Sequence, residues 1–203
     1  LYSTFLNRAF DQLLMDAGLH HEGVTIVLDR AGITGTDGAS HNGMWDIAMC
    51  GIVPGLMLSA PRDCQHLVSV LNEAVDINDR PTVIRYSKDP MPDDIRVVAS
   101  HDGLDVLRDG PGDGILLVAH GQLCAPALAA VDQLDFPVRV VSPRWSLPVC
   151  RGLIEEAAEA RAVVSVEDGL VVSGLGSHLA DALSRRGLWR PIRNLGIPQR
   201  YLG

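Results

Sequence analysis

The chain has 203 residues, of which 47% are hydrophobic and 21% are charged, and its formal net charge is −8. This balance is ordinary for a folded α/β protein and argues against intrinsic disorder. The acidic charge argues against general nucleic-acid binding, which needs a basic surface. The longest apolar runs, 115–119 and 162–166, are far shorter than the roughly 20 residues that a membrane helix needs. We therefore expect a cytoplasmic protein with no nucleic-acid and no membrane partner.

The four cysteines are scattered along the chain without CxxC spacing. Scattered cysteines of this kind favour reduced, mostly buried thiols over a disulfide framework or a zinc site.

The first half of the chain alternates between patterns of helices and strands. Apolar residues recur at helical spacing over 3–19, and Ser3 or Thr4 is expected to cap this helix. Short continuous apolar runs then indicate buried parallel strands. The predicted elements that follow are a strand over 24–28, a glycine-rich loop over 32–43, a helix over 44–50, a strand over 56–59, a helix over 63–78 and a strand over 81–86.

Proline, glycine and charge gather over 87–113, and this composition predicts a linker. Strands separated by helices then indicate βαβ units and mostly parallel sheets. We therefore predict an α/β protein of two three-layer αβα domains, at 1–108 and 109–203. The elements expected after the linker are strands over 115–119, 138–142, 162–167 and 192–195, and helices over 123–133, 153–160 and 176–186.

Polar residues stand at the ends of several predicted strands, where open parallel sheets bind their ligands. These residues are Arg30, Arg85, His120 and Asp168. Two arginines on strand ends of one sheet could clamp a phosphate or a carboxylate. They could equally pair with acids on neighbouring helices, and the residues alone leave both interpretations open.

The loop after the first strand holds Asp37 and His41 four residues apart, among several glycines. A carboxylate beside an imidazole suits hydroxyl recognition and proton transfer near neutral pH. The alternative is a turn-rich loop with a capping aspartate and a surface histidine, and composition alone favours it. A second glycine-rich turn, 174–177, could bind an anion at a helix N-terminus. A tight strand-to-helix turn packed at an interface is the better interpretation there.

Longer stretches of the chain resemble the 1-deoxy-D-xylulose-5-phosphate synthase family. The resemblance covers nearly the whole chain, and its two most specific blocks are YSTFLNRAFDQ (2–12) and LDRAGITGTDGASHNGMWD (28–46). Other matching blocks include TVIRYSK (82–88) and RNLGIPQ (193–199). It implies a partial transketolase-like pyrimidine-binding domain followed by a transketolase C-terminal domain. It also implies a transferase that uses thiamine diphosphate and Mg²⁺ to condense pyruvate with D-glyceraldehyde 3-phosphate. The products are 1-deoxy-D-xylulose 5-phosphate and CO₂, for isoprenoid-precursor, thiamine and pyridoxal synthesis.

The resemblance carries roles over to individual residues. Tyr2 and Arg8 are expected to line the active site near the acceptor substrate. Phe5 is expected to stack on the aminopyrimidine ring of the cofactor. Arg30 and Arg85 are expected to hold the phosphate of glyceraldehyde 3-phosphate.

Asp37 and His41 are the catalytic residues that the resemblance implies, in contact with the donor-derived intermediate and the acceptor hydroxyls. The family's catalytic glutamate, its GDG diphosphate motif and its magnesium ligands belong to parts that these 203 residues do not include. We therefore expect no metal ligands in this chain, no activity from it alone, and a homodimer for the whole protein.

One departure from the family pattern follows Arg85. The family usually continues with Tyr-Pro-Arg-Gly, whereas this chain continues with Tyr86-Ser87-Lys88-Asp89.

Two alternatives to an active synthase stay open. One is a truncated paralogue that binds a phosphosugar or a partner without catalysis. The other is a different thiamine enzyme, either a transketolase or the β-subunit of a 2-oxoacid dehydrogenase.

Overall fold

The first unit is built on a three-stranded parallel sheet, in a computed structural model that describes residues 1–202. Its central strand is β3 (Thr82–Arg85), which pairs with β1 (Thr25–Leu28) on one side and β2 (Met57–Ser59) on the other. Every residue of β3 is buried, as expected for the central strand of a parallel sheet, although Thr82 and Arg85 are polar.

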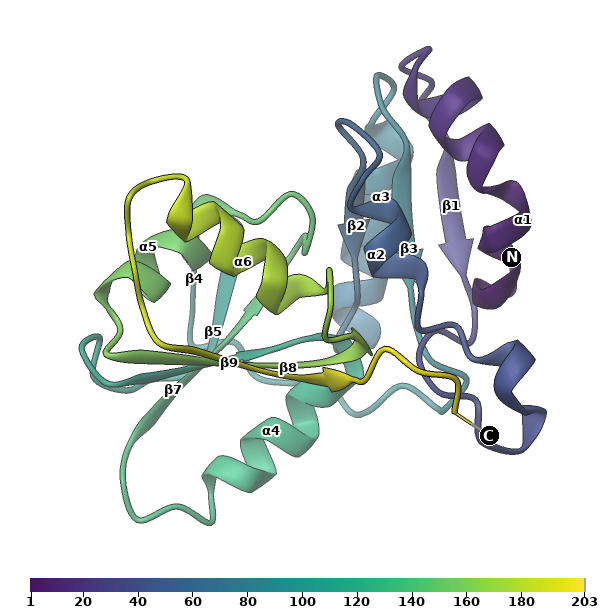
Figure 1. The fold of residues 1–203 in the computed structure, drawn as a ribbon. Coiled ribbons are helices and arrows are strands. Elements are labelled where there is room, and N and C mark those ends of the chain that lie inside the picture. The colour runs from purple at the N-terminus through teal and green to yellow at the C-terminus, as the bar shows by residue number, and fades with distance from the viewer. Residues whose placement is uncertain (203) are drawn as a thin grey trace.

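Helices cover both faces of this sheet (Figure 1). The predicted helix over 3–19 is a continuous helical run in which α1 (Leu6–Asp11) lies between a 3₁₀ turn and a π-helical stretch. It packs with α2 (Asp46–Cys50) on one face, and α3 (Cys64–Asp76) covers the other. Asp63 caps α3, because its carboxylate accepts the backbone N–H of His66 at 2.8 Å.

The second unit contains a six-stranded sheet with the order β4–β5–β7–β6–β8–β9. The pairs β6–β7, β6–β8 and β8–β9 are parallel, and the pairs made by β5 are antiparallel. Helix α4 (Cys124–Val131) lies on one face, and α5 (Arg151–Glu159) and α6 (Leu175–Ser184) lie on the other (Figure 1). The strands are β4 (Ala99–His101), β5 (Leu104–Arg108), β6 (Ile115–Ala119), β7 (Val138–Pro143), β8 (Ala162–Leu170) and β9 (Ile192–Ile197).

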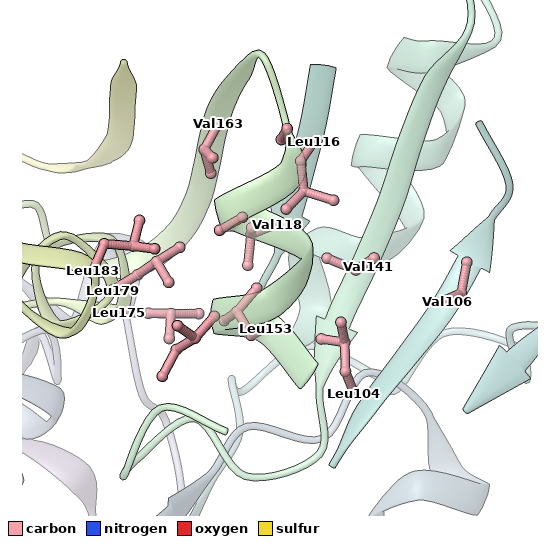
Figure 2. Close-up of a cluster of buried hydrophobic side chains, with 13 residues drawn as sticks. Leu104, Val106, Leu116, Val118, Val141, Leu153, Val163, Leu175, Leu179 and Leu183 are labelled. Carbon is pink, nitrogen blue, oxygen red and sulfur yellow. The ribbon is translucent and has the colours of Figure 1, made fainter. Parts of the chain in front are cut away.

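Figure 2 shows the larger core cluster, in which strand side chains meet the apolar stripes of α5 and α6. Leu153 of α5 and Leu179 of α6 are fully buried against Leu116 and Val118 of β6. Burial of each such side chain stabilises the fold by about 1.5–3 kcal/mol. The predicted class, two three-layer α/β units with mostly parallel sheets, is therefore confirmed.

The predicted linker over 87–113 is wrong in its second half, because it contains β4 and β5. Asp102 and Gly103 join these strands, with φ of 44° and 80°, in the left-handed region that tight hairpin turns require. β5 then pairs with β7, so the structure groups 99–108 with the second unit.

The two units are joined by a shared interface of backbone and side-chain contacts. The N–H of Leu58 donates to the carbonyl of Leu147 at 2.9 Å. Arg144 donates to Glu73 on α3 through Nε at 2.8 Å. These contacts bring the carboxyl ends of β3 and β8 together, as shown by the 2.5 Å contact between Arg85 and Asp168.

No helix within residues 1–202 is long and apolar enough to cross a membrane.

Candidate functional site

The loop between β1 and α2 is closed at its base by backbone hydrogen bonds. Gly32 and Gly43 exchange both N–H···O bonds, at 3.2 and 2.8 Å. A Cβ on Gly43 would lie 2.6 Å from both Ser3 and the Arg30 carbonyl, so this approach requires glycine. The chain between the two glycines, which carries Asp37 and His41, is therefore a fixed ring on the end of the sheet.

The N-terminal segment braces this ring with the hydroxyls that were predicted to cap the first helix. Ser3 Oγ donates to the Gly43 carbonyl at 3.2 Å, and Thr4 Oγ1 donates to the Ser40 carbonyl at 3.0 Å. The capping prediction is thus wrong, because both side chains turn toward the loop. Their neighbours Tyr2 and Phe5 are held over it as a result.

A group of side chains that we call the loop cluster gathers here around Tyr2. The Tyr2 hydroxyl donates to Asp37 Oδ2 at 2.9 Å. The Tyr2 ring meets the His41 ring edge-on, with centroids 5.6 Å apart, and the Phe5 ring at 5.4 Å. The cluster also includes Arg30 and Lys88, and its members are Tyr2, Phe5, Arg30, Asp37, His41 and Lys88.

Arg30 lies against Tyr2 and Asp37. Its guanidinium carbon is 4.7 Å from the Tyr2 ring centroid, and its Nη1 is 3.7 Å from Asp37 Oδ2. Its backbone has φ of 60°, which is strained for a residue with a Cβ and is typical of functional sites. This conformation and the Asp29 carboxylate, 3.4 Å from Nε, hold the Arg30 side chain at the cluster, where 42% of it stays exposed.

Asp37 is the anionic centre of the loop cluster. The hydrogen bond from Tyr2 holds the pKa of this carboxyl below its usual value, and the positive charges of Lys88 and Arg30 act in the same direction. Asp37 is therefore a carboxylate at neutral pH, set between two cations and close to the His41 imidazole.

Two of the predicted site residues lie outside the loop cluster. Arg8 sits at its rim, exposed, with its guanidinium 5.7 Å from the Phe5 ring centroid. Arg85 is only 1% exposed, and its contacts run below the loop to Asp46 and Asp168.

Arg85 is the centre of a second group, which we call the buried relay. Its Nε donates to Asp46 Oδ2 at 2.7 Å and its Nη1 donates to Asp168 Oδ1 at 2.5 Å. Ser3 Oγ lies 3.1 Å from the same Asp46 oxygen and shares its one proton between this oxygen and the Gly43 carbonyl, and Gln122 donates to Asp168 Oδ2 at 3.2 Å. The relay therefore links the segment that carries Tyr2 to the second unit. Its members are Ser3, Asp46, Arg85, Gln122 and Asp168.

Electrostatics in the buried relay favour the charged Arg85–Asp168 pair, whereas burial raises the pKa of Asp46 against the opposing charge of Arg85. Burial alone would raise the pKa of Asp168, but Arg85 outweighs this effect and lowers it. Burial and the charge of Arg85 lower the pKa of His120 to about 3, so the nearby imidazole is neutral. Within residues 1–202, Arg85 Nη2 has no hydrogen-bond partner, so its two N–H donors are unused.

The glycine-rich turn over 174–177 is occupied by a carboxylate of the chain itself. Glu167 accepts the N–H groups of Leu175 and Gly176 at 2.8 and 3.1 Å, at the start of α6. A second anion is not needed there, so the interpretation as a packed strand-to-helix turn is supported.

Several residues of the two groups were not predicted from the sequence. In the sequence, Lys88 stands out only as part of a departure from the family pattern, and Asp46 lies on a predicted helix with no distinctive motif. Asp168 could be found, because it follows a predicted strand. No group of three or more His, Cys, Asp or Glu side chains that could hold a metal occurs in the described part of the chain.

Comparisons with known proteins define the class first. Residues 1–93 match the family description "Transketolase, pyrimidine binding domain", and residues 104–202 match "Transketolase, C-terminal domain". A solved structure titled "Split gene transketolase, inactive beta4 tetramer" superposes with a TM-score of 0.84 at 27% identity, over 100% of this chain and 66% of that one. The chain is thus a transketolase-type pair of domains.

Sequence relatives define the family within that class. The chain is 92% identical, over its whole length, to a 1-deoxy-D-xylulose-5-phosphate synthase of Cutibacterium acnes, and 48% identical to that of Mycobacterium tuberculosis. It spans about a third of the length of these relatives, 32% in both comparisons. The chain belongs to the 1-deoxy-D-xylulose-5-phosphate synthase family.

Proposed function

We propose that this chain forms the acceptor-binding half of a 1-deoxy-D-xylulose-5-phosphate synthase. The whole enzyme would join pyruvate and D-glyceraldehyde 3-phosphate, with loss of CO₂. The observation that carries this proposal is the loop cluster, which gathers Tyr2, Arg30 and His41 around the Asp37 carboxylate. Such a cluster offers a cation for phosphate and a carboxylate and an imidazole for hydroxyls.

Each side chain of the cluster has a task in this proposal. Arg30 binds the acceptor phosphate, and Arg85 supports it from below with the donors of Nη2. Asp37, oriented by Tyr2, accepts a hydrogen bond from an acceptor hydroxyl. His41 exchanges a proton with the acceptor oxygen at the reacting carbon. Phosphate binding far from the reacting carbon positions the aldehyde and so lowers the barrier.

Thiamine diphosphate is the cofactor that the family implies, and Phe5 fits one part of it. The Phe5 ring is 40% exposed beside Tyr2 and His41, so it offers an open face to a flat heterocycle. The cofactor would supply the carbon nucleophile. Arg8, at the edge of this ring, would border the same space. Magnesium ligands and the diphosphate site are assigned to another domain.

We propose further that residues 1–203 are inactive alone and act within a homodimer in the cytoplasm. The split transketolase of similar fold, described as an inactive β4 tetramer, supports the first part by analogy. The whole protein would then need a cofactor-binding domain to complete the site.

Product analysis of the full-length gene product tests this function. Incubation with pyruvate, glyceraldehyde 3-phosphate, thiamine diphosphate and Mg²⁺ is expected to yield 1-deoxy-D-xylulose 5-phosphate. Turnover of ketose phosphates in place of pyruvate would favour a transketolase. Absence of any thiamine-dependent product, with phosphosugar binding retained, would favour the inactive paralogue.

A further inference from the structure

Lys88 reaches the loop cluster from the segment that follows β3. Its Nζ donates to the Thr34 carbonyl at 2.5 Å and lies 3.7 Å from Asp37 Oδ1. Arg30 approaches the other oxygen of the same carboxylate, also at 3.7 Å. The two cations therefore flank Asp37 from the ends of two neighbouring strands, β1 and β3.

The ammonium group of Lys88 keeps donors free for a ligand. It carries three hydrogens, of which the Thr34 carbonyl takes one. The distance to Asp37 is that of an ion pair and is too long for a hydrogen bond. About a third of the Lys88 side chain, 34%, is exposed.

Arg85 is less available than its place at the end of β3 suggests. It is 1% exposed, and two buried carboxylates, Asp46 and Asp168, already balance its charge. A phosphate dianion at the mouth of the loop would thus have Arg30 as its exposed cation and only the Nη2 donors of Arg85 below it, which leaves room for a further cation. Lys88 is a further cation, and it lies beside Asp37, the carboxylate that Arg30 also approaches.

We propose that Lys88 is a specificity-determining residue that binds the phosphate of the acceptor substrate together with Arg30. The inference rests on the proposed function and adds a residue to its phosphate site. On binding, the phosphate takes the free hydrogens of Lys88, while the Thr34 carbonyl keeps the ammonium in place.

The test compares two acceptors that differ only in the phosphate, glyceraldehyde 3-phosphate and D-glyceraldehyde, with the full-length gene product. Lys88→Met keeps the apolar stem and removes the charge. We expect KM for glyceraldehyde 3-phosphate to rise roughly tenfold or more, as for loss of a hydrogen bond to a charged group. KM for D-glyceraldehyde and for pyruvate are expected to stay unchanged. Lys88→Arg is expected to recover most of the loss.

The control variant is Arg80→Met, because Arg80 pairs with Asp79 at the opposite end of β3. It is expected to leave all three KM values unchanged. An equal effect of Lys88→Met on both acceptors, an effect on pyruvate alone, or no effect would overturn the inference. If the unmodified enzyme forms no 1-deoxy-D-xylulose 5-phosphate, the proposed function itself fails, and this result is distinct from a failure of the Lys88 assignment.

Discussion

Tyr2 organises the loop cluster through its two ends. Its hydroxyl fixes Asp37, and its ring carries the Arg30 guanidinium on one side and meets His41 edge-on. A ring with few rotatable bonds holds such an arrangement at a low cost in conformational entropy. The orientation and the pKa of the Asp37 carboxylate therefore depend on the residue that opens the helical run.

Tyr2→Phe removes only the hydroxyl and is expected to raise the pKa of Asp37, because its main stabilising hydrogen bond is lost. A carboxyl with a raised pKa protonates at higher pH. The acid limb of the kcat/KM profile should therefore move to higher pH, with a roughly tenfold loss of kcat/KM on that limb. Tyr201→Phe, at an 81% exposed ring, serves as the control. An acid limb that stays in place would contradict the role given to Tyr2.

The two groups of site residues differ in how far the sequence predicts them. The rule that ligands bind at strand ends finds Arg30, Arg85 and Asp168, because each follows a recognisable apolar run. It does not predict that Arg85 meets Asp168, since that contact depends on the docking of two units. It also misses Tyr2–Asp37, which joins a helix start to a loop 35 residues later.

At the scale of elements, α6 begins on a buried carboxylate. Glu167 is 3% exposed and accepts the first N–H groups of the helix, which otherwise have no partner in the helix. Burial raises its pKa to about 7, against the opposing effect of the two N–H donors. The start of α6 thus contains a group that titrates near neutral pH.

This shift predicts a dependence of stability on pH. Because the folded pKa lies above the ordinary value of 4.5, the folded state binds the proton more tightly than the unfolded state. Between the ordinary pKa of 4.5 and the folded pKa of about 7, the free energy of unfolding should fall by about 1.4 kcal/mol per pH unit as pH rises, from this group alone.

Urea denaturation of the wild type and Glu167→Gln from about pH 5 to about pH 8 measures this effect, because glutamine does not titrate. The wild type is expected to lose stability relative to the glutamine variant as pH rises. Glu167→Ala, which lacks both acceptors, should be less stable than the glutamine variant throughout, by about 1 kcal/mol. Parallel curves for the wild type and Glu167→Gln would show that Glu167 does not titrate in this range.

The long apolar strands and amphipathic helices follow their sequence patterns, whereas β4 and β5 did not stand out. Both strands are short and contain polar or charged residues, and they lie among the prolines and glycines of an apparent linker. The signal that was available is Asp102-Gly103, a pair typical of two-residue hairpin turns. Pairing with β7, which is distant in sequence, then completes the edge of the sheet.

At the scale of the whole molecule, the buried relay joins the two units at the floor of the site. Asp168 comes from the second unit and lies beside Gly32, where an added Cβ would be 2.9 Å from its carboxylate. It therefore contacts both Arg85 and the base of the loop that carries Asp37. The geometry of the loop cluster is in this way tied to the docking of the second unit.

Asp168→Asn is expected to weaken this junction, because Arg85 loses one of its two buried counter-charges. Removal of one partner of a buried ion pair costs about 3–5 kcal/mol of the free energy of unfolding. We expect a loss near about 3 kcal/mol, the lower end of this range, because Asp46 still pairs with Arg85. Urea denaturation measures it. Asp181→Asn, in an exposed pair with Arg185, is the matched control and should change little. Equal effects of the two variants would show that the relay does not hold the units together.

The central claim is that the loop cluster binds the phosphorylated end of the acceptor. Its most direct test is kcat/KM for glyceraldehyde 3-phosphate and for D-glyceraldehyde, in the full-length wild type and in Arg30→Met. We predict that Arg30→Met lowers kcat/KM roughly ten- to hundredfold with the phosphorylated acceptor and leaves it unchanged with D-glyceraldehyde. An equal loss with both acceptors, or no loss with either, would contradict the account.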